Sequence, residues 1–226
     1  VFPGGAVPLF YGGLSFREGT PAQAFNAVFL RNTEGQIAAR YYKRILMPFG
    51  EYMPFADLIP ALRELSPSTG DFTVGDQPIT TTVALRTTAG AAQSFGVGMR
   101  IGCEGLVRAV SNEAVETGAN ILVNFTNDAW YGETVAPYQH HMLAAWRAVE
   151  TDRYLLRVTN TGVTGIVSPL GETERELPIF KEGTILQPVK LLTRRTVQAR
   201  IGNWPVVVLA SIVTLFALNS WFKRKE

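Results

Sequence analysis

The most reactive side chain in the sequence is that of Cys103, the only cysteine among the 226 residues. Cys103 follows Gly102 at the end of an apolar run and directly precedes Glu104. A cysteine attacks as the thiolate, and a neighbouring carboxylate can take its proton. A single cysteine cannot form an internal disulfide, which excludes a structural cross-link within the chain. Two interpretations remain, a nucleophile at the end of a strand and an inert buried thiol.

A second segment could supply a cation to such a thiol. Residues 41–54 contain two adjacent tyrosines, Lys43 and a Pro-Phe-Gly-Glu turn that ends at Glu51. A lysine ammonium beside a cysteine stabilises the thiolate, and it can also stabilise an oxyanion that develops on the substrate. The ordinary alternative is a hairpin end with a solvated lysine, because most lysines lie at the surface.

A third segment, residues 126–132, reads Thr-Asn-Asp-Ala-Trp-Tyr-Gly. It follows an apolar run at residues 121–125, and loops after buried strands often carry functional groups in α/β folds. The candidate side chains are Asn127, Asp128, Trp130 and Tyr131. A capped turn with an interfacial tryptophan fits the same residues. Together the three segments offer a nucleophile, a cation and several carboxylates, the groups that acyl transfer requires.

Alternating strands and helices must position these segments. The hydrophobic patterns predict strands at residues 7–16, 25–32, 36–42, 83–85, 94–102, 121–125, 154–160 and 165–168, and helices at residues 55–65, 106–116 and 138–150. The continuous apolar run at 121–125 is typical of a strand covered on both faces. This alternation predicts an α/β fold with α-β-β-α layers. Because the chain opens on an apparent core strand without a charged leader, we expect further sequence upstream of residue 1.

The low charge content has a local cause. Charged residues make up 18% of the chain, and the net charge of +2 is too small and too scattered to indicate nucleic-acid binding. Residues 204–222 contain no ionisable side chain. As a helix they would span about 28 Å, close to the ~30 Å hydrocarbon core of a bilayer. Trp204 and Trp221 stand at the two ends. The pattern predicts a transmembrane helix, the alternative being a buried core helix.

The basic residues that follow predict the topology. Residues 223–226 would form a cytoplasmic tail under the positive-inside rule. Residues 1–182, a partial catalytic domain, would then lie in the periplasm of a bacterium, and residues 183–203 would form a polar tether to the membrane. An unpaired cysteine in that oxidising compartment needs a functional reason.

The two histidines, His140 and His141, do not indicate a metal site. As neighbours on a helix they lie about 100° apart, which does not suit two ligands of one ion. Neither a second cysteine nor a carboxylate stands at ligand spacing. We predict no metal and no other cofactor, and we expect His140 to form a structural hydrogen bond.

Several motifs, in their order and spacing, make the chain similar to a known family. They are Y-x-K-x-x-L-M-P-F-G-E-Y-x-P at residues 41–54, T-N-D-A-W-Y-G at 126–132, Q-H at 139–140, R-A-x-E at 147–150, R-x-T-N-T-G at 157–162 and G-N-W-P at 202–205. The chain resembles the bacterial apolipoprotein N-acyltransferases, membrane enzymes with a nitrilase-type (carbon–nitrogen hydrolase) catalytic domain. The resemblance extends from about residue 7 to residue 225. It implies a nitrilase-like α-β-β-α sandwich, truncated at its N-terminus and followed by one transmembrane helix.

The resemblance also implies a mechanism. The family uses a Glu–Lys–Cys triad in which Glu is the base, Lys stabilises the thiolate and the oxyanion, and Cys carries the acyl group. Lys43 corresponds to that lysine, Glu51 to a further required glutamate, and Cys103 lies in the nucleophile segment. A phospholipid would acylate the cysteine, and the α-amino group of an apolipoprotein's diacylglyceryl-cysteine would then take the chain from the thioester. The implied location is the bacterial inner membrane.

The sequence departs from this family in two places. The family's base glutamate lies further upstream of the lysine than the 42 residues available here, and Glu18 and Glu34 are too close to Lys43 to replace it. The family reads Ile-Cys-aromatic-Glu, whereas residues 101–104 read Ile-Gly-Cys-Glu, so that the thiol occupies the aromatic position. Because successive strand side chains point to opposite faces, this shift would aim the sulfur away from Lys43 unless a sharp turn compensates.

Two other functions fit parts of the sequence. A membrane-anchored amidase of the same superfamily would use water in place of the lipoprotein amine. A small closed pocket would favour that amidase, and an apolar groove facing the bilayer would favour transfer. A catalytically degenerate homologue would only bind lipid or lipoprotein, and the missing base and shifted thiol favour that alternative.

Overall fold

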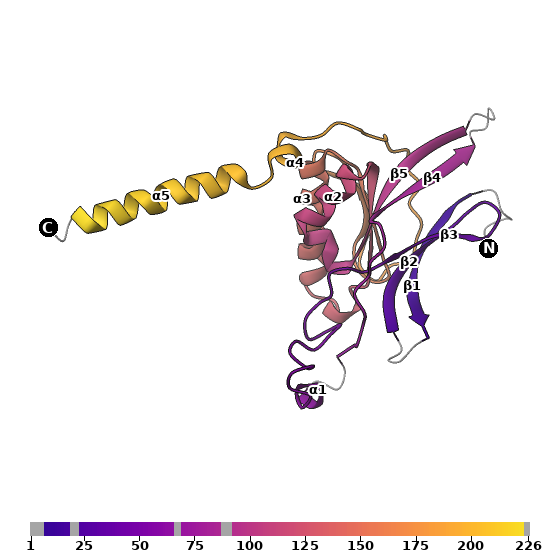
Figure 1. The fold of residues 1–226 in the computed structure, drawn as a ribbon. Coiled ribbons are helices and arrows are strands. Elements are labelled where there is room, and N and C mark those ends of the chain that lie inside the picture. The colour runs from indigo at the N-terminus through magenta and orange to yellow at the C-terminus, as the bar shows by residue number, and fades with distance from the viewer. Residues whose placement is uncertain (1–6, 19–22, 66–68, 87–91, 224–226) are drawn as a thin grey trace.

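The computed structural model describes residues 7–18, 23–65, 69–86 and 92–223, which form two β-sheets and a layer of helices (Figure 1). The first sheet contains β1 (Leu9–Arg17), β2 (Gln23–Arg31) and β3 (Ile37–Tyr42). The second contains, in spatial order, β4 (Thr80–Arg86), β5 (Ala92–Ile101), β6 (Ala119–Thr126), β7 (Leu155–Thr159), β8 (Thr164–Val167) and β9 (Thr173–Leu177). Helices α2 (Arg108–Glu116) and α3 (Ala136–Thr151) cover the side of the second sheet that faces away from the first. The predicted α/β class is confirmed.

The three-stranded sheet is an antiparallel meander. The strands expected at residues 25–32 and 36–42 form as β2 and β3 and pair as a hairpin. The turn between them uses the left-handed backbone of Gly35, with φ of 85°. The expectation of a core strand at residues 7–16 is wrong in part. A strand forms, but it pairs only with β2 among the described strands, and its Leu14 and Phe16 are exposed. Among the described strands β1 is therefore an edge strand, and the backbone groups on one of its sides have no strand partner there.

The centre of the second sheet is parallel, and this places two candidate segments together. β5 pairs with β6 and β6 with β7 in parallel, with Ile101 opposite Phe125 near the carboxyl ends. The turn at Gly102 and the loop that begins at residue 127 therefore leave neighbouring strands at the same edge. Carboxyl ends of parallel strands are where α/β folds collect functional side chains.

The core lies between the two sheets and beneath the helices. β6 is buried along nearly its whole length, which confirms the strand expected from its continuous apolar run. The packed side chains from both sheets include Val28, Leu30, Tyr41, Val97, Met99, Ile101, Val123 and Phe125. The close approach of α2 to β5 depends on Gly98, because a Cβ there would lie 2.8 Å from the Cβ of Ala114.

Two predicted helices need correction, and one strand was not predicted. The helix expected at residues 55–65 is reduced to α1 (Leu62–Leu65), since Phe55 has a positive φ of 62° that no helix accommodates. The helix expected at 106–116 begins only at Arg108, because residues 102–106 form a 3₁₀ turn and Val107 is extended. Strand β9 was not predicted, since its sequence, TEREL, is polar and mostly exposed.

The segment that leads to the C-terminal helix packs against the rest of the domain. Within the predicted tether, Leu192 N donates to Asn120 O, Arg153 donates to Arg194 O, and Thr196 Oγ1 donates to Glu150 O. A short helix, α4 (Val197–Ile201), was not predicted and precedes α5 (Trp204–Lys223). The span Trp204–Trp221 has a mean hydropathy of 1.7 and no buried residue, so α5 is long and apolar enough to cross a membrane. The remainder of the predicted basic tail, residues 224–226, lies outside the described residues.

The packing of β6 generates a stability prediction. Leu122 is fully buried beside Gly98 under the helices. Leu122→Ala removes buried methyl groups and leaves a cavity, so we expect the free energy of unfolding to fall by about 2–5 kcal/mol. Urea denaturation of the detergent-solubilised chain measures this. Leu186→Ala, at a 95% exposed leucine, is the control and is expected to change stability by less than about 0.5 kcal/mol. Equal effects of the two variants would contradict the assignment of the core.

Candidate active site

Lys43 is not the solvated lysine of the ordinary alternative. It follows the last residue of β3, its side chain is 4% exposed, and its Nζ lies 2.5 Å from Glu51 Oε2. The Glu51 carboxylate also accepts hydrogen bonds from Asn26 Nδ2 (3.2 Å) and Met47 N (2.8 Å). The Pro-Phe-Gly-Glu turn thus folds back on the lysine and holds its ammonium in place. Because the ammonium is buried and paired with the Glu51 carboxylate, its positive charge is held at a fixed place in the site.

Glu104 connects this turn to the cysteine segment. Its carboxylate is fully buried and accepts four hydrogen bonds, from Tyr41 Oη (2.9 Å), Arg44 N (2.7 Å), Ile45 N (3.1 Å) and Ile101 N (2.8 Å). Three of these donors flank Lys43 and the fourth ends β5. Glu104 therefore fixes the chain on both sides of the site, and its full burial keeps it out of reach of a substrate.

A sharp turn occurs where the sequence places the shifted thiol. Gly102 has φ of 54°, in the left-handed region that glycine adopts without strain. A Cβ at Gly102 would lie 3.3 Å from Lys43 Nζ, so the side-chain direction of residue 102 points at the ammonium. The Cys103 thiol, one residue later, donates to Ile45 O at 3.6 Å. The turn keeps both positions beside the loop that carries Lys43.

The electrostatics of the Cys103 thiol reflect this placement. Burial raises its pKa, and the charges of Glu51 and Glu104 add to the rise. The Lys43 ammonium acts in the opposite direction, through its charge and through hydrogen bonding to the thiol, but does not cancel the rise. The thiol is therefore largely protonated at neutral pH and needs a proton acceptor before it can attack.

The segment at residues 126–132 forms a second cluster at the same edge. Asp128 is 1% exposed, with Oδ1 at 2.9 Å from His140 Nδ1 and Oδ2 at 2.6 Å from Arg157 Nη2. The hydrogen bond expected of His140 is thus confirmed. Burial acts to raise the pKa of Asp128, but the hydrogen bond from His140 and the charge of Arg157 outweigh it and hold the pKa below its usual range.

The other candidates of this segment lie at its surface. Asn127 Oδ1 accepts from Ala129 N at 3.0 Å and from Asn160 Nδ2 at 2.8 Å, as in a capped turn. Trp130 is 80% exposed and Tyr131 is also exposed. Within the described part of the chain, the hydrogen bonds and ion pairs given above for Asn127 and Asp128 do not reach Lys43, Glu51 or Cys103. The structure brings together Lys43, Glu51, Gly102, Cys103 and Glu104, and it keeps the 126–132 segment as a neighbour.

The partner of Asp128 is Arg157, which was not predicted from the sequence. Arg157 lies on β7, 1% exposed, and supplies the positive charge. A charged residue within a predicted strand was the available signal, because a buried charge requires a partner. The glycine of the same motif, Gly162, is also explained, since a Cβ there would lie 2.2 Å from Asp128 Oδ2.

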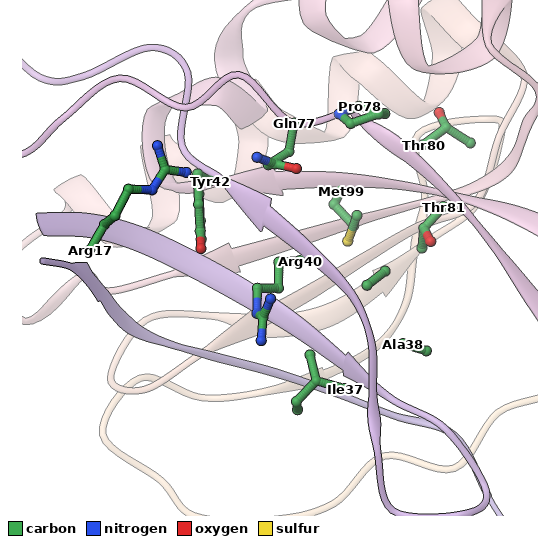
Figure 2. A pocket seen from close by; sticks show the side chains of 11 residues that line it. Arg17, Ile37, Ala38, Arg40, Tyr42, Gln77, Pro78, Thr80, Thr81 and Met99 are labelled. Carbon is green, nitrogen blue, oxygen red and sulfur yellow. The ribbon is translucent and has the colours of Figure 1, made fainter. Parts of the chain in front are cut away.

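The cavity between β3 and β4 lies apart from the site. A cavity of about 420 Å³ lies at the edge between β3 and β4, lined by residues such as Arg17, Arg40 and Gln77, and it does not include the lysine or the cysteine (Figure 2). Among the described residues, no group of three or more His, Cys, Asp and Glu side chains could hold a metal ion.

The sequence pattern of the carbon-nitrogen hydrolases matches residues 6–199. The chain belongs to the carbon–nitrogen hydrolase family. Within this family it is similar to apolipoprotein N-acyltransferases, which confirms the resemblance stated from the motifs. It is 35% identical to the protein of that name from Geobacter metallireducens over 213 residues, and 36% identical to that from Gloeobacter violaceus over 206 residues. These matches cover 93% and 89% of this chain but only 38% and 37% of the relatives.

A solved structure confirms the nitrilase-like fold of this family member. The crystal structure of an amidase from Nesterenkonia sp. superposes with a TM-score of 0.52 at 21% identity, covering 77% of this chain and 58% of the amidase. At that identity the likeness concerns the fold. It agrees with two facing sheets and an outer helical layer, as Figure 1 shows.

The Asp128 cluster generates a prediction about stability and pH. Asp128→Asn leaves Arg157 buried without its counter-charge, so we expect the free energy of unfolding at pH 7 to fall by about 3–5 kcal/mol. Because the folded-state pKa of Asp128 is depressed, its contribution is present above the unfolded-state pKa of ~3.9 and is lost as pH falls through the folded-state value. The difference between variant and parent in urea denaturation should therefore shrink below about pH 4.

Asp152→Asn is the matched control for this experiment. Asp152 also pairs with an arginine, Arg194, but that side chain is 79% exposed. An exposed pair of this kind contributes about 0–1 kcal/mol. A loss at Asp128 no larger than that at Asp152, or one that is independent of pH, would contradict the buried cluster.

The electrostatics of Cys103 generate a second prediction. The rate of alkylation by iodoacetamide should rise with pH through a pKa above the ~8.5 of a free cysteine. Lys43→Met removes the charge that lowers this pKa, so we expect the pKa to rise further and alkylation near neutral pH to become slower. Lys43→Arg keeps the charge and should stay close to the parent. An unchanged pH profile in Lys43→Met would show that the ammonium does not act on the thiol.

Proposed function

We propose that the protein is an N-acyltransferase that moves an acyl chain from a phospholipid, through a cysteine thioester, to the N-terminal diacylglyceryl-cysteine of apolipoproteins. We further propose that it acts at the bacterial inner membrane, with residues 1–182 in the periplasm and the C-terminus in the cytoplasm. The observation that carries the proposal is the meeting of Lys43, Glu51 and the Gly102–Cys103 turn at the carboxyl end of β5. The relatives' name and the apolar helix α5 support it.

In the proposed reaction Cys103 is the acyl carrier and Lys43 the electrostatic catalyst. The Cys103 thiolate attacks the ester carbonyl of the phospholipid, a C–S bond forms, and the C–O bond breaks. The leaving alkoxide takes up a proton and departs as lysophospholipid. The acceptor amine then attacks the thioester, a C–N bond forms, and the thiolate is released as the amine loses its proton. Lys43, held by Glu51, stabilises the oxyanion of both steps.

The surroundings of Lys43 suit an apolar substrate. The loop that follows Lys43 exposes a series of large apolar side chains: Ile45, Met47, Phe49, Phe55, Leu58 and Ile59. An exposed apolar surface beside a reactive group favours a lipid over a small polar amide. This is the reason for preferring acyl transfer from a lipid to the hydrolysis of a small amide.

The proton of Cys103 needs an acceptor that the described carboxylates do not provide. Glu51 is paired with Lys43, and Glu104 already accepts four hydrogen bonds. The base glutamate implied by the resemblance has no counterpart in residues 1–42. We propose that this base belongs to the part of the relatives' length that the chain does not match, and the thioester experiment is therefore designed for the longest available gene product.

One observation favours the non-catalytic alternative. The side-chain direction that points at Lys43 belongs to residue 102, and this residue is a glycine. A homologue that had lost its nucleophile would keep the backbone turn and the lysine but not the thiol at this position. A lipid or lipoprotein could then bind without chemistry.

The test is the capture of the thioester. After incubation with phosphatidylethanolamine we expect intact-protein mass spectrometry to show one acyl chain on Cys103, removable by hydroxylamine. Cys103→Ser should abolish the adduct, and Lys43→Met should slow its formation about 10²–10³-fold through loss of oxyanion stabilisation. Addition of a diacylglyceryl-cysteine peptide should transfer the chain to its amine. Release of free fatty acid instead would identify the hydrolase.

A double variant separates the catalytic proposal from the non-catalytic one. Gly102→Cys combined with Cys103→Ser moves the thiol to the position that points at Lys43. An adduct in this variant but not in the parent would overturn the role of Cys103 and identify the natural protein as a binding homologue. An adduct in the parent that is lost in Cys103→Ser would exclude that alternative.

A further inference from the structure

The outer face of α3 is apolar, the reverse of an ordinary surface helix. Its exposed positions are Tyr138, Gln139, Met142, Leu143, Trp146 and Val149, of which only Gln139 is clearly polar. Their spacing of three and four residues places them in one stripe on the helix, opposite the buried alanines. A surface helix normally turns charged residues to water. We call these six residues the α3 stripe.

The apolar exterior is specific to α3. The neighbouring helix α2 turns polar side chains outward, and its Glu113 and Glu116 pair with Arg44 and Arg195. Both helices cover the same sheet, yet only α3 has an apolar outer face. The position of a helix in this layer therefore does not explain the α3 stripe. A contiguous exposed apolar surface of this size marks an interaction site.

The α3 stripe continues into the membrane helix. The C-terminal half of α3 packs against α4, whose N-cap Thr196 donates to Glu150 O. α4 exposes Val197 and Ile201, one helical turn apart, and Trp204 then begins α5. Figure 1 shows α5 leaving on the side of the molecule that the helices cover and pointing away from both sheets. A bilayer that contains α5 therefore lies on the side to which α3 turns its stripe.

We propose that the α3 stripe is a membrane-binding surface, which lies in the headgroup and upper acyl region of the bilayer that α5 spans. Tyr and Trp prefer this region because one end of each is apolar and the other polar, and an amphipathic helix lies in it with its apolar face buried about 5–10 Å deep. The stripe runs from Tyr138 to Val149, about 17 Å along α3, so it fixes the rotation of the domain on the membrane. This inference rests on the proposed membrane location and not on the thioester chemistry.

The test measures the depth of α3 in the full chain reconstituted into vesicles of phosphatidylethanolamine and phosphatidylglycerol. Single cysteines are introduced at Met142→Cys and Val149→Cys in a Cys103→Ser background and labelled with the fluorophore NBD. Both labels should emit at shorter wavelength than in water, lose most of their quenching by aqueous iodide, and be quenched by lipids with a nitroxide near the headgroup. Leu215→Cys in α5 is the control within the bilayer. Leu14→Cys, at an exposed position of β1 in the sheet that lies away from the helices, is the aqueous control.

Other occupants give distinguishable results. Labels at 142 and 149 that are quenched by iodide like the label at 14 would overturn the proposal. Labels shielded from iodide but not quenched by the lipid nitroxides, with energy transfer between differently labelled copies, would identify a second copy and overturn it as well. Trp146→Glu should return the Met142→Cys label to water, while circular dichroism confirms that the variant folds. Because the readout is depth, failure of the thioester experiment leaves this result interpretable.

Discussion

The buried carboxylate of Glu104 is the contact on which the candidate site depends. Burying a charge costs several kcal/mol unless hydrogen bonds replace its water. Glu104 meets this requirement with four donors, which come from two segments about 60 residues apart in sequence. Arg100 is also fully buried, and burial lowers its pKa to about 9. The negative charge of Glu104 acts in the opposite direction and raises this pKa in part. The end of β3 and the end of β5 are thus joined by one group.

The Glu104 contacts fix the backbone of the site independently of the side chains that would carry out the chemistry. The left-handed turn at Gly102, the position of Lys43 and its pairing with Glu51 follow from backbone contacts that do not require a thiol at any one residue. The identity of residues 102 and 103 decides what the turn presents to the ammonium. A nitrilase-like scaffold therefore accommodates either an acyl carrier or a binding site at this edge without a change of fold.

The sequence allowed prediction where local pattern and final environment agree. The run at 121–125 is apolar on both sides because β6 lies between helices and a second sheet, and the motif at 41–54 concentrates the groups that meet at Lys43. Prediction failed where a distant contact decides. Asp128, in the loop after β6, pairs with Arg157 on β7, 29 residues later. The local pattern shows only that Arg157 is a charge within a strand, and it does not indicate which residue is its partner. The helix expected at 55–65 fails because Phe55 adopts a positive φ that its residue type does not signal.

The chain that leads to the apolar helix α5 is attached to the domain. Residues between β9 and α4 bond to Asn120, Asp152 and Arg153 on the domain, so the chain does not reach α5 as a free linker. A linker of this length without such contacts would leave the domain free to rotate over the membrane. These contacts hold the chain to the domain as far as α4, a few residues before α5 begins. In the proposed acyl transfer they would limit how far the domain moves from a bilayer that α5 spans, so that a substrate whose acyl chains stay in that bilayer would meet the site over a short range of distances.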